Sequence, residues 1–196
     1  MKIELKIELL GISNPTVWRQ IKVSPEITFH QLHEIIQAAF GWKSSHLYQF
    51  SENGFRDLIS IGSPRDEEGV INGAVVSASP LLFRMYNGSM FDKERAPKLR
   101  YIYDFGDSWE HEISVLDFDR TPGVKTELVD GGGACPPEDC GGIPGFQDLK
   151  ICLKTGKPSA IHGGDWKSWL DGVGYVGYEV DGFDLKVARR GLAKLK

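Results

Sequence analysis

Hydrophobic and polar residues alternate strictly along residues 2–9, which read Lys-Ile-Glu-Leu-Lys-Ile-Glu-Leu. A period of two is typical of a β-strand with one buried face. A turn signal, Ser-Asn-Pro at residues 13–15, comes next, and residues 17–23 then alternate again. The two alternating segments therefore predict a hairpin at the start of the chain.

The period becomes helical after Thr28. Thr28 and Gln31 have the spacing of a capping box, in which each side chain accepts a hydrogen bond from a free backbone N–H at the helix start. Gly41 suits the left-handed residue that ends a helix. Between these ends the apolar residues follow helical spacing: Phe29, Leu32, Ile35, Ile36, Ala39 and Phe40. An amphipathic helix is therefore expected here.

The remaining elements have weaker signals. We expect strands at residues 46–50, 57–61 and 124–130, a loop at 62–80, an apolar segment of ambiguous period at 81–86, and an exposed connection at 87–98. We expect helices to begin at Pro144, near residue 165 and after Asp184, which would cap the last helix. Because strands and helices do not alternate regularly, the predicted fold class is α+β. We expect a single domain over residues 1–196, with a roll-like mixed or antiparallel sheet and packed helices.

Composition narrows the class of protein. Of the 196 residues, 41% are hydrophobic and 11% aromatic, enough for a substantial core. The 23 lysines and arginines and the 27 acidic residues give a net charge of −4, which predicts no chain-wide attraction to nucleic acid or to an anionic membrane. Charged residues interrupt the N-terminal apolar residues, and no segment is long enough to span a bilayer. Three cysteines are too few for a disulfide framework, so we expect a cytoplasmic protein.

Residues 101–113, Tyr-Ile-Tyr-Asp-Phe-Gly-Asp-Ser-Trp-Glu-His-Glu-Ile, combine four aromatic residues with acids and a histidine. A hairpin with a three-residue loop, Gly-Asp-Ser, would place Phe105 opposite Trp109 and Tyr103 opposite His111. These four side chains would share one face, because a strand has a period of two. The other face would carry the charged residues.

In this predicted register Asp104 and Glu110 would repel each other across the strands, by a few tenths to about 1 kcal/mol. A shared proton or a metal would relieve the repulsion, and so would Arg100, Arg19 or Lys22 on a merely solvated face. The candidate polar site comprises Asp104, Asp107, Glu110, His111, His46 and Arg19. Carboxylates and imidazole together suit a divalent metal such as zinc or manganese. Turn chemistry is the alternative for the aspartate at 107, and a core hydrogen bond is the alternative for the histidine at 111.

Cys135 and Cys140 lie in Cys-Pro-Pro-Glu-Asp-Cys, whose spacing suits one arm of a zinc site. The sequence has no second motif of this kind, so the fold would have to supply further ligands, from among Cys152, His111, His46 and His162. The alternative is a proline-stiffened turn with two small, reduced thiols near each other.

Two motifs, "YIYDFGDSWEHEI" and "GACPPEDCGG", resemble the plasmid ORF-three-like domain family, named from an open reading frame of a root-inducing plasmid. "VWRQIKV", "LHEIIQAAFGW", "HLYQF" and "GFDLKVARRGL" resemble it too, so the resemblance spans nearly the whole chain, with residues 62–98 longer and irregular. It implies a compact α+β roll-like domain and brings no established activity. Some relatives are labelled passenger proteins of insertion elements, or resolvase-like, but the chain has no recognisable serine-recombinase motif. The positions that match the family motifs are Trp18, Arg19, Trp42, His46, Tyr103, Asp104, Phe105, Gly106, Asp107, Trp109, His111, Cys135 and Cys140.

Three functions remain open. The first is a non-catalytic binding or accessory module with a protein partner or a link to mobile elements. The second is a metal-dependent hydrolase that uses the Asp/Glu/His cluster, where a divalent ion would activate water. The third is a nucleic-acid-binding accessory factor that uses the basic C-terminal residues Lys186, Arg189, Arg190, Lys194 and Lys196.

Overall fold

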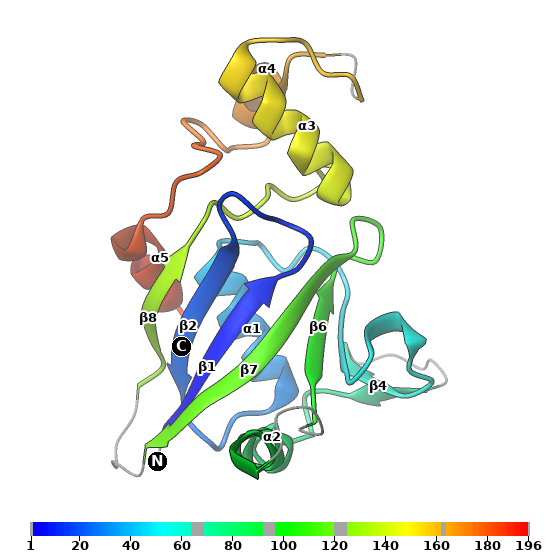
Figure 1. Cartoon of the computed structure of the whole chain (residues 1–196), viewed down its shortest axis with the longest axis vertical. Helices are drawn as coiled ribbons and strands as arrows, with labels where there is room; N and C mark the ends of the chain where they lie inside the picture. Colours follow the sequence, from blue (N-terminus) through cyan, green and yellow to red (C-terminus); the bar gives the residue numbers. More distant parts are fainter. Residues whose placement is uncertain (1, 64–68, 92–96, 120–124, 162–163, 196) are drawn as a thin grey trace.

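The structure is a computed structural model of the whole chain, and it describes all residues except 1, 64–68, 92–96, 120–124, 162–163 and 196 (Figure 1). The strands are β1 (Lys2–Leu9), β2 (Val17–Val23), β3 (Tyr48–Ser51), β4 (Ser60–Gly62), β5 (Val70–Asn72), β6 (Leu99–Tyr103), β7 (Trp109–Asp119) and β8 (Glu127–Gly132). The helices are α1 (Phe29–Phe40), α2 (Ser79–Phe91), α3 (Gly142–Thr155), α4 (Trp166–Gly172) and α5 (Leu185–Leu192), with a short 3-10 helix, η1 (Gly54–Arg56).

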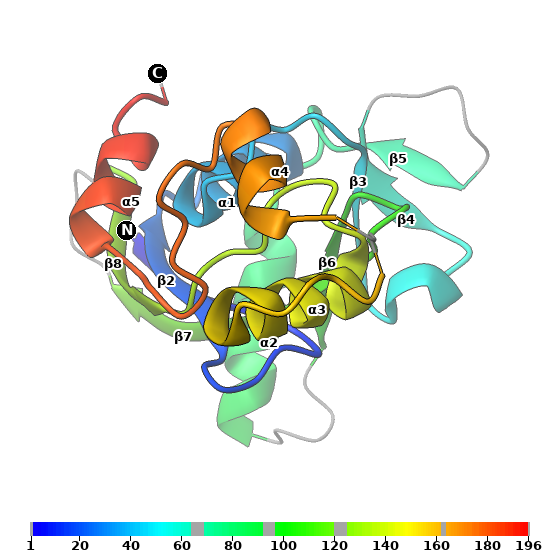
Figure 2. The ribbon, with the colours of Figure 1, turned by 90° about the horizontal axis from the view of Figure 1, so that it is seen from above.

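The strands form one mixed sheet in the order β5-β4-β3-β6-β7-β1-β2-β8. All neighbouring pairs are antiparallel except β4 and β5, which are parallel. Helix α1 lies across one face of this sheet, and α3 and α4 lie beyond one end of the strands, as the view from above shows (Figures 1 and 2). The predicted α+β class with a mixed sheet and packed helices is confirmed.

The core lies between the sheet and α1, where the sequence periods place apolar side chains. Ile3, Leu5, Ile7 and Leu9 of β1 are fully buried, as their alternation predicts. The predicted capping box of α1 is present: the Gln31 backbone N–H donates to the Thr28 hydroxyl, and the Thr28 backbone N–H donates to the Gln31 side chain. Gly41 ends the helix with φ of 91°. Local signals and burial therefore agree for the first third of the fold.

The middle of the chain differs from its prediction. The strand expected at 57–61 begins later in the structure, at Ser60, where β4 starts. Leu58, which lies within the expected strand, is 94% exposed. The expected loop at 62–80 contains β5 and the first residues of α2, and part of it lies outside the described residues. Helix α2 covers the ambiguous segment at 81–86 and continues to Phe91, into the expected connection at 87–98. Pro80 in its first turn, where proline is tolerated, was the missed signal of a helix start.

The C-terminal elements follow their predictions more closely. Strand β8 begins later than the expected 124–130 strand, of which residue 124 lies outside the described residues. Helix α3 contains Pro144 in its first turn, and the side chains of Asp165 and Asp184 cap α4 and α5. Helix α5 lies beside the edge strand β8, where the Arg189 guanidinium donates hydrogen bonds to the Leu128 and Val129 carbonyls. No helix among these described elements is long and apolar enough to cross a bilayer.

The central hairpin, β6–β7, corrects the predicted register. Tyr103 pairs with Trp109 and Tyr101 pairs with His111, so the loop has five residues, 104–108, instead of three. The predicted partners are wrong, but the predicted faces are right for the paired residues, because a shift of two positions preserves the face of every side chain. Glu110 consequently lies opposite Ile102, and the expected repulsion between Glu110 and Asp104 is absent.

Candidate metal centre

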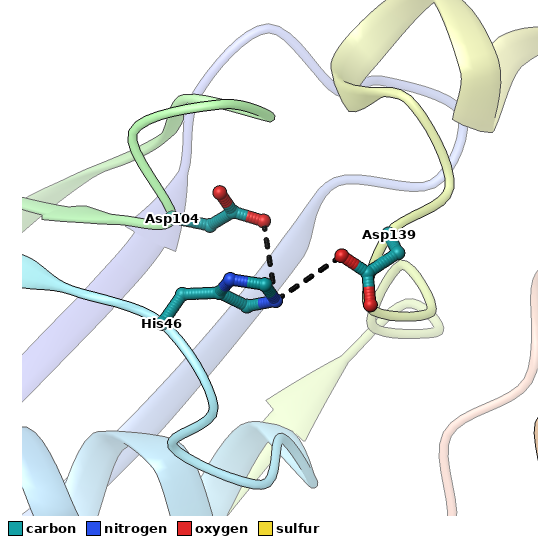
Figure 3. A group of neighbouring side chains, drawn as sticks. All are labelled: His46, Asp104 and Asp139. Atoms are coloured by element: carbon teal, nitrogen blue, oxygen red, sulfur yellow. Dashed lines mark ion pairs between the residues drawn. The ribbon is translucent and has the colours of Figure 1, made fainter.

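Three side chains from distant parts of the sequence converge at the end of β6: His46, Asp104 and Asp139 (Figure 3). The His46 Nε2 atom lies 3.2 Å from Asp139 Oδ1 and 3.6 Å from Asp104 Oδ2. All three atoms lie within 4.8 Å of one another, and no other group of three His, Cys, Asp or Glu ligands occurs among the described residues. We call this group the three-ligand site.

Asp104 is the most enclosed of the three, with 7% of its surface exposed. It has φ of 56°, and its backbone carbonyl accepts a hydrogen bond from the Ser108 N–H, which closes the five-residue loop. Its Oδ1 atom accepts from the backbone N–H groups of Gly106 and Asp107. The other oxygen, Oδ2, faces His46. The loop thus fixes one carboxylate oxygen and directs the second into the three-ligand site.

His46 lies in the segment between α1 and β3, with its ring edge-on to the Tyr103 ring. Its Nε2 atom is buried, and no hydrogen bond of adequate geometry satisfies it among the described residues. The atom instead lies within ion-pair distance of two carboxylate oxygens, those of Asp104 and Asp139, as a metal ligand would.

Asp139 completes the three-ligand site from the segment before α3, with φ of 59°. Its side chain is 71% exposed, so the site opens to solvent on this side. Asp139 lies within Cys-Pro-Pro-Glu-Asp-Cys, the motif that the sequence analysis examined for its thiols. The acidic pair between the two cysteines was the signal that would have indicated this ligand.

The donor atoms fit a divalent cation. Imidazole nitrogen and carboxylate oxygen bind zinc at about 2.0–2.2 Å, and ligands at that distance from one ion lie about 3–4 Å apart. The two measured separations at His46 fall in this range. Mixed nitrogen and oxygen donors without sulfur also suit manganese or iron. Three protein ligands leave at least one coordination position for water or another ligand.

Asp107, another predicted site residue, lies beside the three-ligand site. Its Oδ2 atom accepts a hydrogen bond from the Gly141 N–H, which joins the hairpin loop to the segment before α3. Burial, followed by the nearby Asp104 and Asp139 carboxylates, raises the pKa of Asp107, while a backbone N–H at Gly142 opposes the rise. The structure therefore places Asp107 next to the ligands, in a bridging role.

Glu110 and His111 lie away from the three-ligand site. Glu110 is on the outer face of the hairpin, 3.8 Å from Arg100, which also pairs with Glu112 at 2.9 Å. Arg100 thus provides the solvated-face alternative that the sequence allowed. His111 is fully buried against the aromatic rings of Phe40 and Trp42. Burial lowers the pKa of His111 to about 3, so its imidazole is neutral at pH 7.

Arg19 lies on β2 and joins the sheet to α1. Its guanidinium donates hydrogen bonds to the carbonyls of Ala39, Trp18, Gly132 and Gly133. It is enclosed between the rings of Phe40 and Phe183, at 4.8 and 4.1 Å from their centroids. Burial lowers its pKa to about 10. Its contacts connect parts of the fold and include none of the three ligands.

Cys135 and Cys140 are free thiols, and burial raises the pKa of both. A thiolate binds metal and a neutral thiol does so poorly, so these surroundings do not favour zinc. Cys152 is also a free thiol, close to Asp148. His162, which the sequence offered as a further ligand, lies outside the described residues.

A cleft of about 1170 Å³ lies elsewhere, between α5 and the end of α1. Lys186, Arg190 and Lys194 line it, together with the Arg189 that binds β8. Lys196, the last of the predicted basic residues, lies outside the described part of the chain. The basic C-terminal residues and the three-ligand site are therefore separate features of the surface.

The fold is that of an α+β protein with one mixed sheet, and the three-ligand site lies at the end of its central hairpin. The chain belongs to the family described as plasmid pRiA4b ORF-3-like protein, whose model matches residues 2–187.

Two relatives illustrate the family. The uncharacterized protein y4hQ of Sinorhizobium fredii is 35% identical over 177 residues, which is 88% of this chain and 82% of that protein. The crystal structure of MM3350, a protein of unknown function from Methanosarcina mazei Go1, has a similar fold, with a TM-score of 0.72 and 26% identity. The similarity covers 95% of this chain and 96% of that one. The resemblance read from the sequence is thereby confirmed.

Proposed function

We propose that this protein is a divalent-cation-binding module whose cation is held by His46, Asp104 and Asp139. The observation that carries the proposal is the buried His46 Nε2 atom, which lacks a hydrogen-bond partner among the described residues and faces two carboxylate oxygens. A cation at this point would satisfy the nitrogen and neutralise the two acids. The module would act as a binding or accessory domain, and the plasmid in the family description is the reason for associating it with mobile elements.

A second candidate function, metal-dependent hydrolysis, is favoured by the number of ligands. Structural zinc sites are closed by four protein ligands, whereas catalytic sites keep an open position for water. The three-ligand site opens to solvent beside Asp139, where a bound water would be activated by the ion. The two candidates share the same cation, so the first test is metal binding.

Titration calorimetry of chelator-treated protein with Mn²⁺ and Zn²⁺ tests the proposal. We expect one site per chain in the wild type and at least a tenfold weaker affinity in Asp139→Asn, because the substitution removes an anionic ligand. The matched control is Asp171→Asn, an exposed aspartate on α4 that should leave the affinity unchanged. Absence of binding in the wild type, or equal affinity in wild type and Asp139→Asn, would refute the proposal.

A further inference from the structure

The residues that precede two of the ligands in the chain contact one buried carboxylate, that of Glu138, and Glu138 itself precedes the third ligand. Glu138 is itself followed by Asp139, Ser45 is followed by His46, and Tyr103 is followed by Asp104. From this arrangement we infer that Glu138 is a positioning residue, which sets the three ligands at the separations that a cation requires. The inference rests on the proposed metal-binding function and assigns a residue that the ligand set does not include.

The Glu138 carboxylate accepts hydrogen bonds from three groups, and the one from Tyr103 is short and buried. Its Oε1 atom accepts a hydrogen bond from the Tyr103 hydroxyl at 2.6 Å and another from the Lys43 backbone N–H at 2.9 Å. Its Oε2 atom accepts from the Ser45 hydroxyl at 3.4 Å. Tyr103 is fully buried, and Glu138 is 7% exposed. The Glu138 carboxylate therefore connects three parts of the chain: the segment between α1 and β3, the end of β6, and the segment before α3.

Tyr103 strengthens this connection. Its hydroxyl accepts a hydrogen bond from the Ser45 backbone N–H at 3.0 Å while it donates to Glu138. At 2.6 Å, the hydrogen bond from the Tyr103 hydroxyl is the shortest of those that Glu138 accepts. Each of Ser45, Tyr103 and Glu138 thus hydrogen-bonds to the other two, and each is followed in the chain by one of the three ligands.

The chemistry of these contacts requires an acceptor at position 138. All three groups that reach the side chain are donors, two hydroxyls and one backbone N–H. Glutamine has nearly the same shape and can keep an oxygen for Lys43 and Tyr103, but its NH₂ group would have to donate to the Ser45 hydroxyl, which reverses that hydrogen bond. Glutamine also removes the negative charge that strengthens the other two hydrogen bonds. Groups that orient metal ligands in this way typically change metal affinity by 10–100-fold when mutated.

The test compares Mn²⁺ affinity and coordination in the wild type and in Glu138→Gln. We expect a 10–100-fold weaker affinity in Glu138→Gln, with His46, Asp104 and Asp139 all still present. We also expect a changed electron paramagnetic resonance spectrum of the bound Mn²⁺, because the ligands move relative to the ion. A role in folding alone would lower the stability of the metal-free protein and leave the spectrum of the bound ion unchanged.

Two further variants protect the test against misfolding of Glu138→Gln. Tyr103→Phe removes one donor from the carboxylate, and Ser45→Ala removes another, and each should weaken Mn²⁺ binding by several fold. The control is Glu112→Gln on the outer face of the same hairpin, where the partner is Arg100. It should bind Mn²⁺ as the wild type does.

The outcomes separate the inference from the function on which it rests. Mn²⁺ binding in the wild type with equal affinity and spectrum in Glu138→Gln, Tyr103→Phe and Ser45→Ala would overturn the positioning role and leave the metal site intact. Lack of binding in the wild type would overturn both. Weaker binding with an altered spectrum, and an unchanged Glu112→Gln, would support both.

Discussion

At the scale of single residues, Asp104 has two separable tasks. Its Oδ1 atom accepts hydrogen bonds from the backbone N–H groups of Gly106 and Asp107 in the hairpin loop, and its Oδ2 atom faces His46. Asparagine keeps an oxygen for the loop and loses the negative charge. The substitution therefore tests the role of Asp104 in cation binding without removing its role in the hairpin loop.

The Asp104→Asn variant should melt near the wild-type temperature in chelator and should show no rise when Mn²⁺ is added. In the wild type, a free Mn²⁺ concentration of 100 times the dissociation constant should stabilise the folded state by about 2.7 kcal/mol. Thermal melts of both proteins, with and without Mn²⁺, measure the difference. An equal metal-induced rise in both would show that Asp104 is not a ligand.

Arg19 is expected to contribute to stability and not to metal binding. Arg19→Met would leave the carbonyls of Ala39, Gly132 and Gly133 without their donor, at a cost of about 2–4 kcal/mol in the free energy of unfolding. Urea denaturation measures this cost, with the exposed Arg190→Met as a control that should change it by less than about 0.5 kcal/mol. A loss of metal affinity in Arg19→Met with full stability would instead place Arg19 in the site.

The sequence predicts a residue's partners well only where they are local. His46 and Asp104 were recognised because they lie in conspicuous motifs, but their convergence with Asp139 depends on the packing of three segments. Glu138 belongs to the acidic pair between the cysteines, but nothing local indicated its contacts, since its partners at 43, 45 and 103 are distant in the chain. The role of Glu138 follows from the burial of its carboxylate, which cannot be predicted from the sequence alone.

At the scale of elements, the hairpin shows how far a period of two carries. The aromatic face of β6–β7 was predictable because parity determines it, whereas the loop length depends on Asp104 and Ser108 adopting positive φ. Helix α1 was predictable because its two caps and its apolar stripe agree. Helix α2 was not, because the apolar residues at 81–86 have no clear period and Pro80 alone did not identify the helix start.

The junction between the hairpin loop and α3 depends on a glycine. Gly142 has φ of 65°, and a Cβ atom there would lie 2.7 Å from the Asp107 backbone carbonyl oxygen. Gly156, at the other end of α3, has φ of 69° and nothing within 4 Å of such an atom. The two glycines therefore have nearly the same φ and differ in the space available to a side chain.

Gly156→Ala should lower the free energy of unfolding by about 1 kcal/mol, the cost of a left-handed alanine. Gly142→Ala should cost about 1–3 kcal/mol more, because the carbonyl at 107 must move. It should also weaken Mn²⁺ binding, since the same loop carries Asp104. Denaturant titrations of the pair measure the difference, and equal costs would contradict the close approach.

At the scale of the whole molecule, two buried histidines make the fold sensitive to acid. Burial lowers the pKa of both His33 and His111 to about 3. His33 Nδ1 lies 2.8 Å from the Tyr101 hydroxyl, and Gln37 donates to the same hydroxyl, so Tyr101 donates its proton to a neutral His33. Between about pH 3 and 6.5, each histidine is therefore neutral in the folded state and protonated in the unfolded chain.

Stability should accordingly be constant above about pH 6.5 and fall as the pH is lowered from about 6.5 towards 3, where the unfolded chain binds more protons. Each histidine contributes a slope of about 1.4 kcal/mol per pH unit in this window. Urea denaturation of metal-free protein across the window measures it. His33→Gln, which keeps a hydrogen-bonding group, should reduce the slope by one histidine's share, and an unchanged slope would contradict the assignment.

The central claim, that a cation binds between His46, Asp104 and Asp139, is tested most directly by crystallography. Crystals of the wild-type protein soaked in Mn²⁺, measured for anomalous scattering, should show a peak about 2.0–2.3 Å from His46 Nε2, Asp104 Oδ2 and Asp139 Oδ1. The peak should be absent from crystals of Asp139→Asn treated in the same way. A wild-type map with no peak at these three atoms, or with the ion held instead by Cys135 and Cys140, would contradict the account.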